Sequence, residues 1–404
     1  MVPPPLPLPA SLTPTDRRLD HLDALRGFAL FGILLVNMHG FKSSFVSWSA
    51  TEAYLPGILN LLAIQLIDVF ATGKFVSVFS FLFGLGLAQQ WQHWSGTRPS
   101  LFRWFILRRM SVLLILGVLH GMVLWCGDIL TFYAVMGMTT IFLVRRRTLT
   151  LLVLAAVVFL LHSGLLLLGS YLEATYGEMN HNWRETADAW VECYQSDDFW
   201  WITSSRIDEW KYAIESLFLS LSFHSFVFFL LGMAAGKAGP SQLLERHESL
   251  LRKWLPPTLL TGIALSVLGK VQDFGWLPFS EQMWWLRAVQ YPGGTTLMAL
   301  CYITGGALVF HSGRWPHITR WLSAAGRMSL SNYLFQSIVA NVIFMGWGFG
   351  LYGRTTAYSG SVICVALFTG QVALSQLWLR RFRNGPVEYL WRKLAYRAKK
   401  ESAA

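Results

Sequence analysis

The stretch LRRMSVLLILGVLHGMVLWCGDILTFYAVMGM, residues 107–138, decides how this chain folds. Two apolar runs, 105–125 and 129–144, meet at a tight turn around Gly127, and arginines border the pair at both far ends. An α-helix of about 20 apolar residues crosses the roughly 30 Å hydrocarbon core of a bilayer. The pattern therefore predicts a helical hairpin that crosses a membrane and returns.

Similar apolar runs recur along all 404 residues. The chain is 54% hydrophobic and only 14% charged, whereas a soluble globular domain carries roughly 25% charged residues. We expect an all-α fold, a polytopic helical bundle of about ten transmembrane helices in the lipid bilayer. The candidate spans are residues 22–40, 58–89, 105–125, 129–144, 149–171, 217–236, 254–271, 293–311, 328–348 and 359–379.

Lysine and arginine are distributed unevenly between these runs. Connections rich in Lys and Arg alternate with connections that have few, and this pattern fixes orientation in membrane proteins. The alternation predicts that both termini are cytoplasmic and that the acid-rich segment 173–215 lies outside. It also accounts for the net charge of +11, so no nucleic-acid partner is expected.

The same alternation divides the chain into five parts. The Pro-rich N-terminal tail lacks a charged segment followed by an apolar core, so no cleavable signal peptide is expected. The Trp-rich segment between the membrane halves predicts a helix on the outer interface, with a lid over an external site as the alternative. The parts are a cytoplasmic tail at 1–21, membrane halves at 22–171 and 217–379, an extracytoplasmic amphipathic loop at 172–216, and a basic cytoplasmic tail at 380–404.

The second span is too long for a single straight crossing. It carries Asp68, Gly73 and Lys74 in its interior, and polar groups there favour a broken, tilted or partly re-entrant helix. Broken membrane helices often line functional sites.

Several familiar site motifs are missing from the sequence. It contains no Walker loop, GxSxG elbow or HExxH helix in a suitable context, which argues against ATP-driven transport and soluble-type hydrolase chemistry. The cysteines Cys126, Cys193, Cys301 and Cys364 have no metal-ligand spacing, so no metal is expected.

The hairpin carries the main catalytic candidates. His120 lies just inside the membrane and Asp128 follows just across the outer turn. A carboxylate beside an imidazole fixes its tautomer and raises its basicity, so the pair suits a general base and its orienting partner. A capping aspartate with a hydrogen-bonded histidine is the structural alternative. His39, at the outer end of the first span, is a second candidate base.

Other polar residues in the spans are candidates for ligand binding. Arg26 suits a phosphate delivered from the cytoplasm, or an ion pair with Asp23 three residues before it. Asp68 and His224 are predicted toward the outer half, where they would share a cavity. Asn332 and Gln336 follow a helical stripe that fits substrate contact or hydrogen bonding between helices.

Some of these segments resemble a known bacterial family. The first span, LDALRGFALFGILLVNMHGF at 22–41, the hairpin, and GRMSLSNYLFQS at 326–337 and GPVEYLWRKLAY at 385–396 look like the YeiB-like membrane proteins and their domain of unknown function 418. The RG and VN pairs of the first span are also similar to the transmembrane acyltransferase superfamily, which includes heparan-alpha-glucosaminide N-acetyltransferase and acyltransferase 3 proteins.

The second resemblance implies an activity. Those relatives transfer acyl groups from cytoplasmic acyl-CoA to external sugars, with an outer histidine that activates the acceptor. By that likeness Arg26 and Asn37 belong to the path of the acyl donor. Trp48 stands where the glucosaminide enzymes have their histidine, so His120 with Asp128 is assigned the role of base on spacing instead.

We therefore expect a transmembrane acyltransferase of the bacterial cytoplasmic (inner) membrane. Acyl-CoA, for example acetyl-CoA, is the expected donor, and the acceptor is a hydroxyl or amine of a sugar, lipid or small molecule. A homodimer is left open. The alternatives are a transporter for a small molecule that uses the broken second span, and a non-catalytic scaffold whose polar residues only hold helices together.

Overall fold

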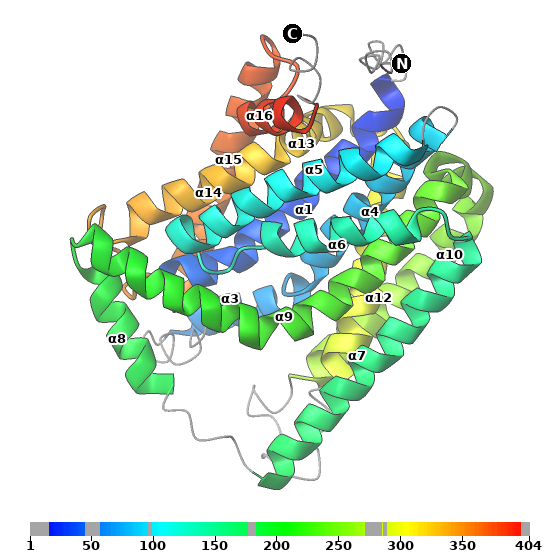
Figure 1. Cartoon of the computed structure of the whole chain (residues 1–404). Helices are drawn as coiled ribbons and strands as arrows, with labels where there is room; N and C mark the ends of the chain where they lie inside the picture. The colour runs from blue at the N-terminus through cyan, green and yellow to red at the C-terminus, as the bar shows by residue number, and fades with distance from the viewer. Residues whose placement is uncertain are drawn as a thin grey trace.

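The computed structural model describes residues 16–44, 57–95, 99–176, 183–270, 285 and 289–396. Within these ranges the chain forms α-helices and two π-helical turns and no β-strand, which confirms the predicted all-α bundle (Figure 1). The elements are α1 (Asp16–Lys42), α3 (Ile58–Phe70), α4 (Lys74–Ser95), α5 (Pro99–Leu119), η1 (His120–Leu124), α6 (Leu130–Leu143), α7 (Thr148–Tyr176), α8 (Trp183–Gln195), α9 (Phe199–Ala238), α10 (Pro240–Leu268), η3 (Gln290–Thr295), α12 (Thr296–His311), α13 (Pro316–Arg327), α14 (Ser329–Phe344), α15 (Ala357–Leu379) and α16 (Pro386–Tyr396).

Six helical segments in the described ranges are long and apolar enough to span a membrane, and two shorter apolar helices accompany them. The remaining two predicted spans fall on α10, which contains Pro256 and Pro257, and on α14, which has 16 residues. The long segments are Asp20–Lys42, Ile58–Gln92, Phe102–Leu124, Thr148–Tyr176, Pro292–His311 and Ala357–Leu379, and the shorter ones are Leu130–Leu143 and Ser222–Ala238.

The predicted interruption of the second span is present. Helix α3 ends at Phe70 and α4 begins at Lys74, after a turn in which Gly73 has a φ of 78°. A positive φ favours glycine because a Cβ would be strained there. The Lys74 ammonium donates to the Asp68 carbonyl at 2.8 Å, and Lys270 pairs with the Asp68 carboxylate at 3.1 Å. The break is thus held together by two lysines.

Helix α1 forms the centre of the bundle. It packs against α4, α12, α13, α14 and α15, and its Ala24, Ala29 and Leu34 are fully buried. A Cβ on Gly326 of α13 would overlap the carbonyl oxygen of Asp23, so glycine is what allows α13 to lie directly on α1.

Contacts at the two ends of the bundle agree with the predicted topology. At one end Lys237 donates to the Val144 carbonyl at 2.8 Å, and Trp391 donates to the Arg109 carbonyl at 2.8 Å. At the other end the amide of Gly353 donates to the carbonyl of Lys42 at 2.8 Å. The Arg-rich connection after α6, the end of α9 and the C-terminal helix therefore share one end.

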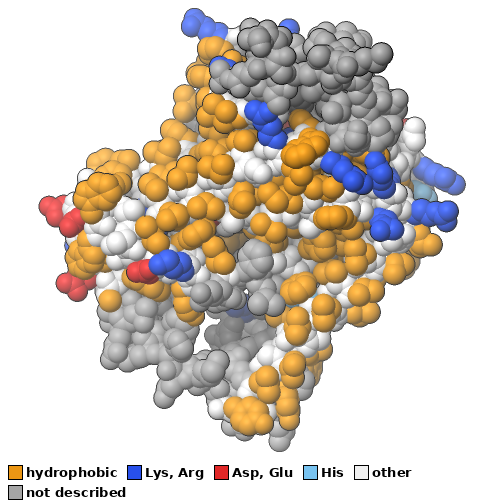
Figure 2. All heavy atoms as spheres, viewed as in Figure 1, with side chains coloured by type: hydrophobic (Ala, Val, Ile, Leu, Met, Phe, Trp, Pro, Cys, Tyr) orange, Lys and Arg blue, Asp and Glu red, His pale blue; other side chains and the backbone are white. Residues whose placement is uncertain are grey.

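The surface fits a membrane protein. In Figure 2 hydrophobic side chains are spread over the part of the visible face that is described, Lys and Arg gather mainly toward its upper right, and the few acidic side chains lie toward the left. Large apolar side chains of α7, such as Leu149, Leu160 and Leu168, are more than half exposed. Such a surface requires lipid around it.

The predicted boundary between a loop ending at residue 216 and a membrane helix beginning at residue 217 is not present in the structure. Helix α9 runs without interruption from Phe199 to Ala238, and Asp198 accepts hydrogen bonds from the amides of Trp200 and Trp201 at its start. The second half of the predicted loop is therefore an extension of a membrane helix. This extension carries Arg206 and Glu209 into the protein interior, where both are buried.

Candidate active site

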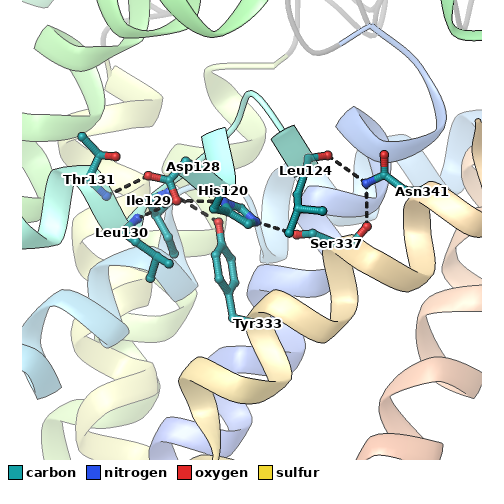
Figure 3. Close-up of polar contacts among 9 residues, drawn as sticks. All are labelled: His120, Leu124, Asp128, Ile129, Leu130, Thr131, Tyr333, Ser337 and Asn341. Atoms are coloured by element: carbon teal, nitrogen blue, oxygen red, sulfur yellow. Dashed lines mark hydrogen bonds and ion pairs between the residues drawn. The ribbon is translucent and has the colours of Figure 1, made fainter. Parts of the chain in front are cut away.

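The hairpin and α14 bring together a histidine, an aspartate and a serine (Figure 3). His120 Nδ1 lies 2.9 Å from Asp128 Oδ1, and His120 Nε2 lies 2.8 Å from Ser337 Oγ. The side chains of His120 and Asp128 are 1% and 0% exposed, and Ser337 is fully buried. The predicted pairing of His120 with Asp128 is present, and the imidazole ring of His120 has Ser337 as a second hydrogen-bond partner.

Local backbone structure positions the first two residues. α5 ends in the π-helical turn η1, which begins at His120, and π-turns in helices are frequent at functional sites. Asp128 precedes α6 and accepts hydrogen bonds from the amides of Leu130 at 3.1 Å and Thr131 at 2.7 Å. These amides would otherwise be unsatisfied at the start of the helix. Asp128 thus caps α6 and holds His120 at the same time.

This geometry assigns the proton on the imidazole. A carboxylate that accepts two amide hydrogen bonds is held in place as an acceptor, so His120 Nδ1 carries the hydrogen that it donates to Asp128. His120 Nε2 is then the acceptor, and the Ser337 hydroxyl donates to it. The arrangement has the order of hydrogen bonds found in serine–histidine–aspartate triads.

Two further residues of α14 face the hairpin. The ring of Tyr333 lies 5.0 Å from the His120 ring between centroids, and its hydroxyl accepts from the Ile129 amide at 3.4 Å. Asn341 Nδ2 donates to the Ser337 carbonyl at 2.7 Å and to the Leu124 carbonyl at 2.8 Å (Figure 3). Asn341 therefore joins α14 to the end of η1, one turn beyond the histidine.

The N-terminal part of α9, which begins at Phe199, covers this region. Arg206 donates to the Asn341 side-chain oxygen at 2.8 Å, and the Tyr194 hydroxyl of α8 donates to Glu209 at 2.6 Å. Burial raises the pKa of Tyr194 well above its usual range. A cavity of about 10 Å³, room for about one water molecule, lies among these residues and is lined also by Leu124.

The structure places His39 at the same end of the bundle. It is buried on α1, and the next residues contact the hairpin: Trp125 donates to the Gly40 carbonyl at 3.3 Å, and its ring lies 4.6 Å from that of Phe41. His39 is thus a neighbour of the site rather than one of the residues hydrogen-bonded to His120.

The predicted donor path lies along α1. Arg26 forms an ion pair with Asp23 near the start of α1, and its side chain is 29% exposed. Asn37, about three turns further along, has a buried Nδ2 atom without a hydrogen-bond partner in the described part of the chain. Their roles in donor binding stay predictions.

The other predicted binding residues have partners away from His120. Asp68 pairs with Lys270, and the ring of His224 lies 5.8 Å from that of His162. The single cavity predicted for Asp68 and His224 is not seen among the described contacts, and their substrate roles stay predictions.

The polar stripe of α14 faces α15. Asn332 donates to Ser375 at 3.0 Å, and Gln336 donates to Gln371 at 2.9 Å. These contacts are the hydrogen bonds between helices that the stripe also predicted. Tyr333, Ser337 and Asn341, at spacings of four residues, form the adjacent stripe and face the hairpin. Their helical spacing marks them as one stripe in the sequence, but it does not say which neighbour that stripe faces.

A helical membrane bundle with a buried Ser–His–Asp cluster at one end defines the class of this protein. The family described as "Protein of unknown function (DUF418)" matches residues 235–398. "Uncharacterized protein YxaH" of Bacillus subtilis (strain 168) is 31% identical over 96% of this chain and 97% of its own length. The chain therefore belongs to the YeiB-like, DUF418 family.

Two more relatives extend the match. "Uncharacterized protein YeiB" of Escherichia coli (strain K12) is 28% identical over 93% of this chain and 96% of its own length. A 39.9 kDa protein encoded in the amylase 3' region of Bacillus acidopullulyticus is 25% identical over 95% of both chains. No solved structure matches significantly. The resemblance to the YeiB-like family is confirmed over nearly the whole chain.

Proposed function

We propose that this protein is an acyltransferase of the bacterial cytoplasmic membrane. It moves an acyl group from cytoplasmic acyl-CoA, such as acetyl-CoA, to a hydroxyl or amine of a sugar, lipid or small-molecule acceptor on the outer side. The observation that carries the proposal is the buried His120 imidazole, bonded to a carboxylate through one nitrogen and to a hydroxyl through the other. An imidazole held in this way is suited to take a proton from a nucleophile.

The overall transfer is balanced. His120 Nε2 takes the proton of the attacking hydroxyl or amine, whose oxygen or nitrogen forms a bond to the acyl carbon. The C–S bond of the thioester breaks, and the CoA thiolate leaves and takes up a proton. Asp128 holds the Nδ1 hydrogen and stabilises the imidazolium that forms during the step.

The positions of the basic residues support a donor that enters from the cytoplasmic end. Arg26 is partly exposed at the start of α1, and guanidinium groups bind phosphates such as those of CoA. Along an α-helix Arg26 and His39 are separated by about 20 Å, at ~1.5 Å per residue. The thioester must therefore reach deep into the bundle, while the phosphates stay at its cytoplasmic end.

Transport of a small molecule is the second candidate function. The observation in its favour is the break between α3 and α4, with Asp68, Lys74 and Lys270 around it. Broken helices with ionisable groups form substrate sites in several transporter folds. Transport would give uptake into vesicles without any chemical change of acetyl-CoA.

The proposal is tested with purified full-length protein and radiolabelled acetyl-CoA. Thioester cleavage and label transfer to a panel of sugars, lipids and amines are measured for the wild type, His120→Ala and His39→Ala. We expect transfer by the wild type and its loss in His120→Ala. No CoA release and no transfer by the wild type would contradict the proposal.

A matched control separates chemistry from folding. His162 is a buried histidine of α7 that lies outside the Ser–His–Asp cluster. His162→Ala should keep transfer activity in protein that elutes as the wild type does in gel filtration. If both histidine variants lose activity equally, His120 has no special role.

A further inference from the structure

We propose that Ser337 is the nucleophile of a two-step transfer, in which the acyl group is carried as an ester on its Oγ atom. The inference rests on the proposed acyl transfer and specifies how that transfer proceeds. Ser337 Oγ is 2.8 Å from His120 Nε2, within the distance from which a general base accepts a proton.

The hydrogen bond of Ser337 differs from the bond that several helical serines in this protein make within their own helix. A serine inside a helix commonly donates to the carbonyl four residues earlier. Four described serines do so at 2.7 to 2.8 Å: Ser77, Ser80, Ser163 and Ser361. The Ser337 hydroxyl contacts a histidine of another helix instead, so its orientation is set by the site and not by its own helix.

The surroundings of Ser337 hold it in register with the base. The Asn341 side chain donates both to the Ser337 carbonyl and to the carbonyl of Leu124 at the end of η1. Because η1 begins at His120, this link fixes the serine relative to the imidazole from a second direction. Asn341 is therefore a positioning residue.

Tyr333 supplies a donor for the developing negative charge. Its ring lies beside that of His120, and its hydroxyl accepts from the Ile129 amide. Among the described residues, the hydroxyl of Tyr333 donates no hydrogen bond to an acceptor. Its proton is therefore free to bind the thioester oxygen in the transition state.

Each half of the reaction is balanced. In the first, the Ser337 proton moves to His120 Nε2, Oγ bonds to the acyl carbon, the C–S bond breaks, and the CoA thiolate leaves with the proton from His120. In the second, the acceptor gives its proton to His120 and attacks the ester carbon. The bond from that carbon to Oγ breaks, and Ser337 recovers its proton.

Burial of the site suits a covalent intermediate. Ser337 and His120 are 0% and 2% exposed, and the cavity lined by Leu124 and Asn341 has room for only about one water molecule. An ester in this position is protected from hydrolysis until an acceptor enters. A stable acyl-enzyme should therefore accumulate when no acceptor is present.

The first test is trapping of this ester. The purified full chain is incubated with radiolabelled acetyl-CoA without acceptor, denatured, and analysed for label by peptide mass spectrometry. We expect at most one label per chain, on Ser337, and none in Ser337→Ala. Ser337→Cys should trap a thioester that neutral hydroxylamine releases. Ser361→Ala, which removes a hydroxyl bonded only within its own helix, should label as the wild type does.

A second probe makes the inference independent of the acyl donor. A fluorophosphonate forms an O–P bond to an activated serine and releases fluoride, and we expect it to label Ser337 in the wild type but not in His120→Ala. Full transfer activity in Ser337→Ala would overturn the serine ester and leave the acyltransferase intact. Labelling of Ser337 by the probe without turnover of acetyl-CoA would support the nucleophile and count against the proposed donor. Absence of both would overturn both proposals.

Discussion

The Nε2 atom of His120 lies 2.8 Å from the Oγ atom of Ser337, although the residues are 217 positions apart in the chain. His120 belongs to the α5–α6 hairpin and Ser337 to α14. The contact therefore exists only when α14 is docked on the hairpin. Substitutions that weaken this docking should reduce activity and stability together, whereas substitutions in the proton path should reduce activity alone.

Asp128→Asn tests the proton path. The asparagine amide occupies nearly the same space, but it no longer fixes the hydrogen of His120 on Nδ1. We expect acyl transfer to fall by about 100-fold or more with a small change in melting temperature. Asp208→Asn, in an exposed ion pair with Lys211, is the control and should retain full activity. Undiminished transfer in Asp128→Asn would show that the carboxylate is only a helix cap.

Asn341→Leu tests the packing of α14 against the α5–α6 hairpin. The substitution leaves the Leu124 carbonyl without its side-chain donor, and an unsatisfied buried polar group costs about 1–3 kcal/mol. We expect a lower melting temperature in detergent and a lower rate of acyl transfer. Val342→Leu changes a neighbouring side chain that is 39% exposed and should alter neither. Equal behaviour of the two variants would argue against a role for Asn341 in holding α14.

Gly84 and Gly86 give a matched pair for helix packing within α4. A Cβ on Gly84 would overlap the Phe229 carbonyl of α9, whereas a Cβ on Gly86 meets nothing within 4 Å. Gly84→Ala should lower stability by about 1–3 kcal/mol through overpacking. Gly86→Ala should raise it by about 0.5–1 kcal/mol because alanine favours the helix. Thermal unfolding in detergent compares them, and equal shifts would contradict the close packing of α4 on α9.

Tyr194→Phe tests the contact between α8 and α9 through the pH dependence of protein stability. Burial raises the pKa of Tyr194, so the phenol stays neutral in the folded protein, while in the unfolded chain it ionises at about pH 10. Its contribution to stability is fully present below about pH 10 and is lost as the pH rises toward the folded pKa. The melting temperature of the wild type should fall more steeply above about pH 10 than that of Tyr194→Phe.

Two further results define the outcome for Tyr194. Near neutral pH the variant should melt a few degrees lower, because Glu209 loses the hydrogen bond that Tyr194 donates at 2.6 Å. Tyr358→Phe, which removes the hydroxyl of an exposed tyrosine, should follow the wild type. Parallel pH curves for the wild type and Tyr194→Phe would mean that this phenol ionises alike in both states.

The sequence was sufficient to predict the helical bundle, the break in the second span and the meeting of His120 with Asp128. The last two are local features: Lys74 and Asp68 are six residues apart, and His120 and Asp128 are eight apart across one turn. A short separation along one segment limits the positions that two side chains can take relative to each other. Periodicity and turn residues are therefore enough to bring them together.

Ser337 and Arg206 could not be found in this way. Ser337 directly follows Gln336 on α14, so the two side chains lie on different faces of the helix. The polar residues of α14 do not show which of these faces packs against α15 and which packs against the hairpin. Arg206 lies in a segment polar enough to be taken for a surface loop, yet it is buried because α9 is continuous through it. Both positions depend on packing between segments distant in sequence, which a single sequence does not specify.

The most direct test of the central claim is the rate of CoA release from acetyl-CoA by purified His120→Ala, compared with the wild type and His162→Ala at equal folded concentration. The account predicts a loss of about 100-fold or more in His120→Ala, with the wild-type rate retained in His162→Ala. Equal rates in all three proteins, or no CoA release by the wild type, would contradict it.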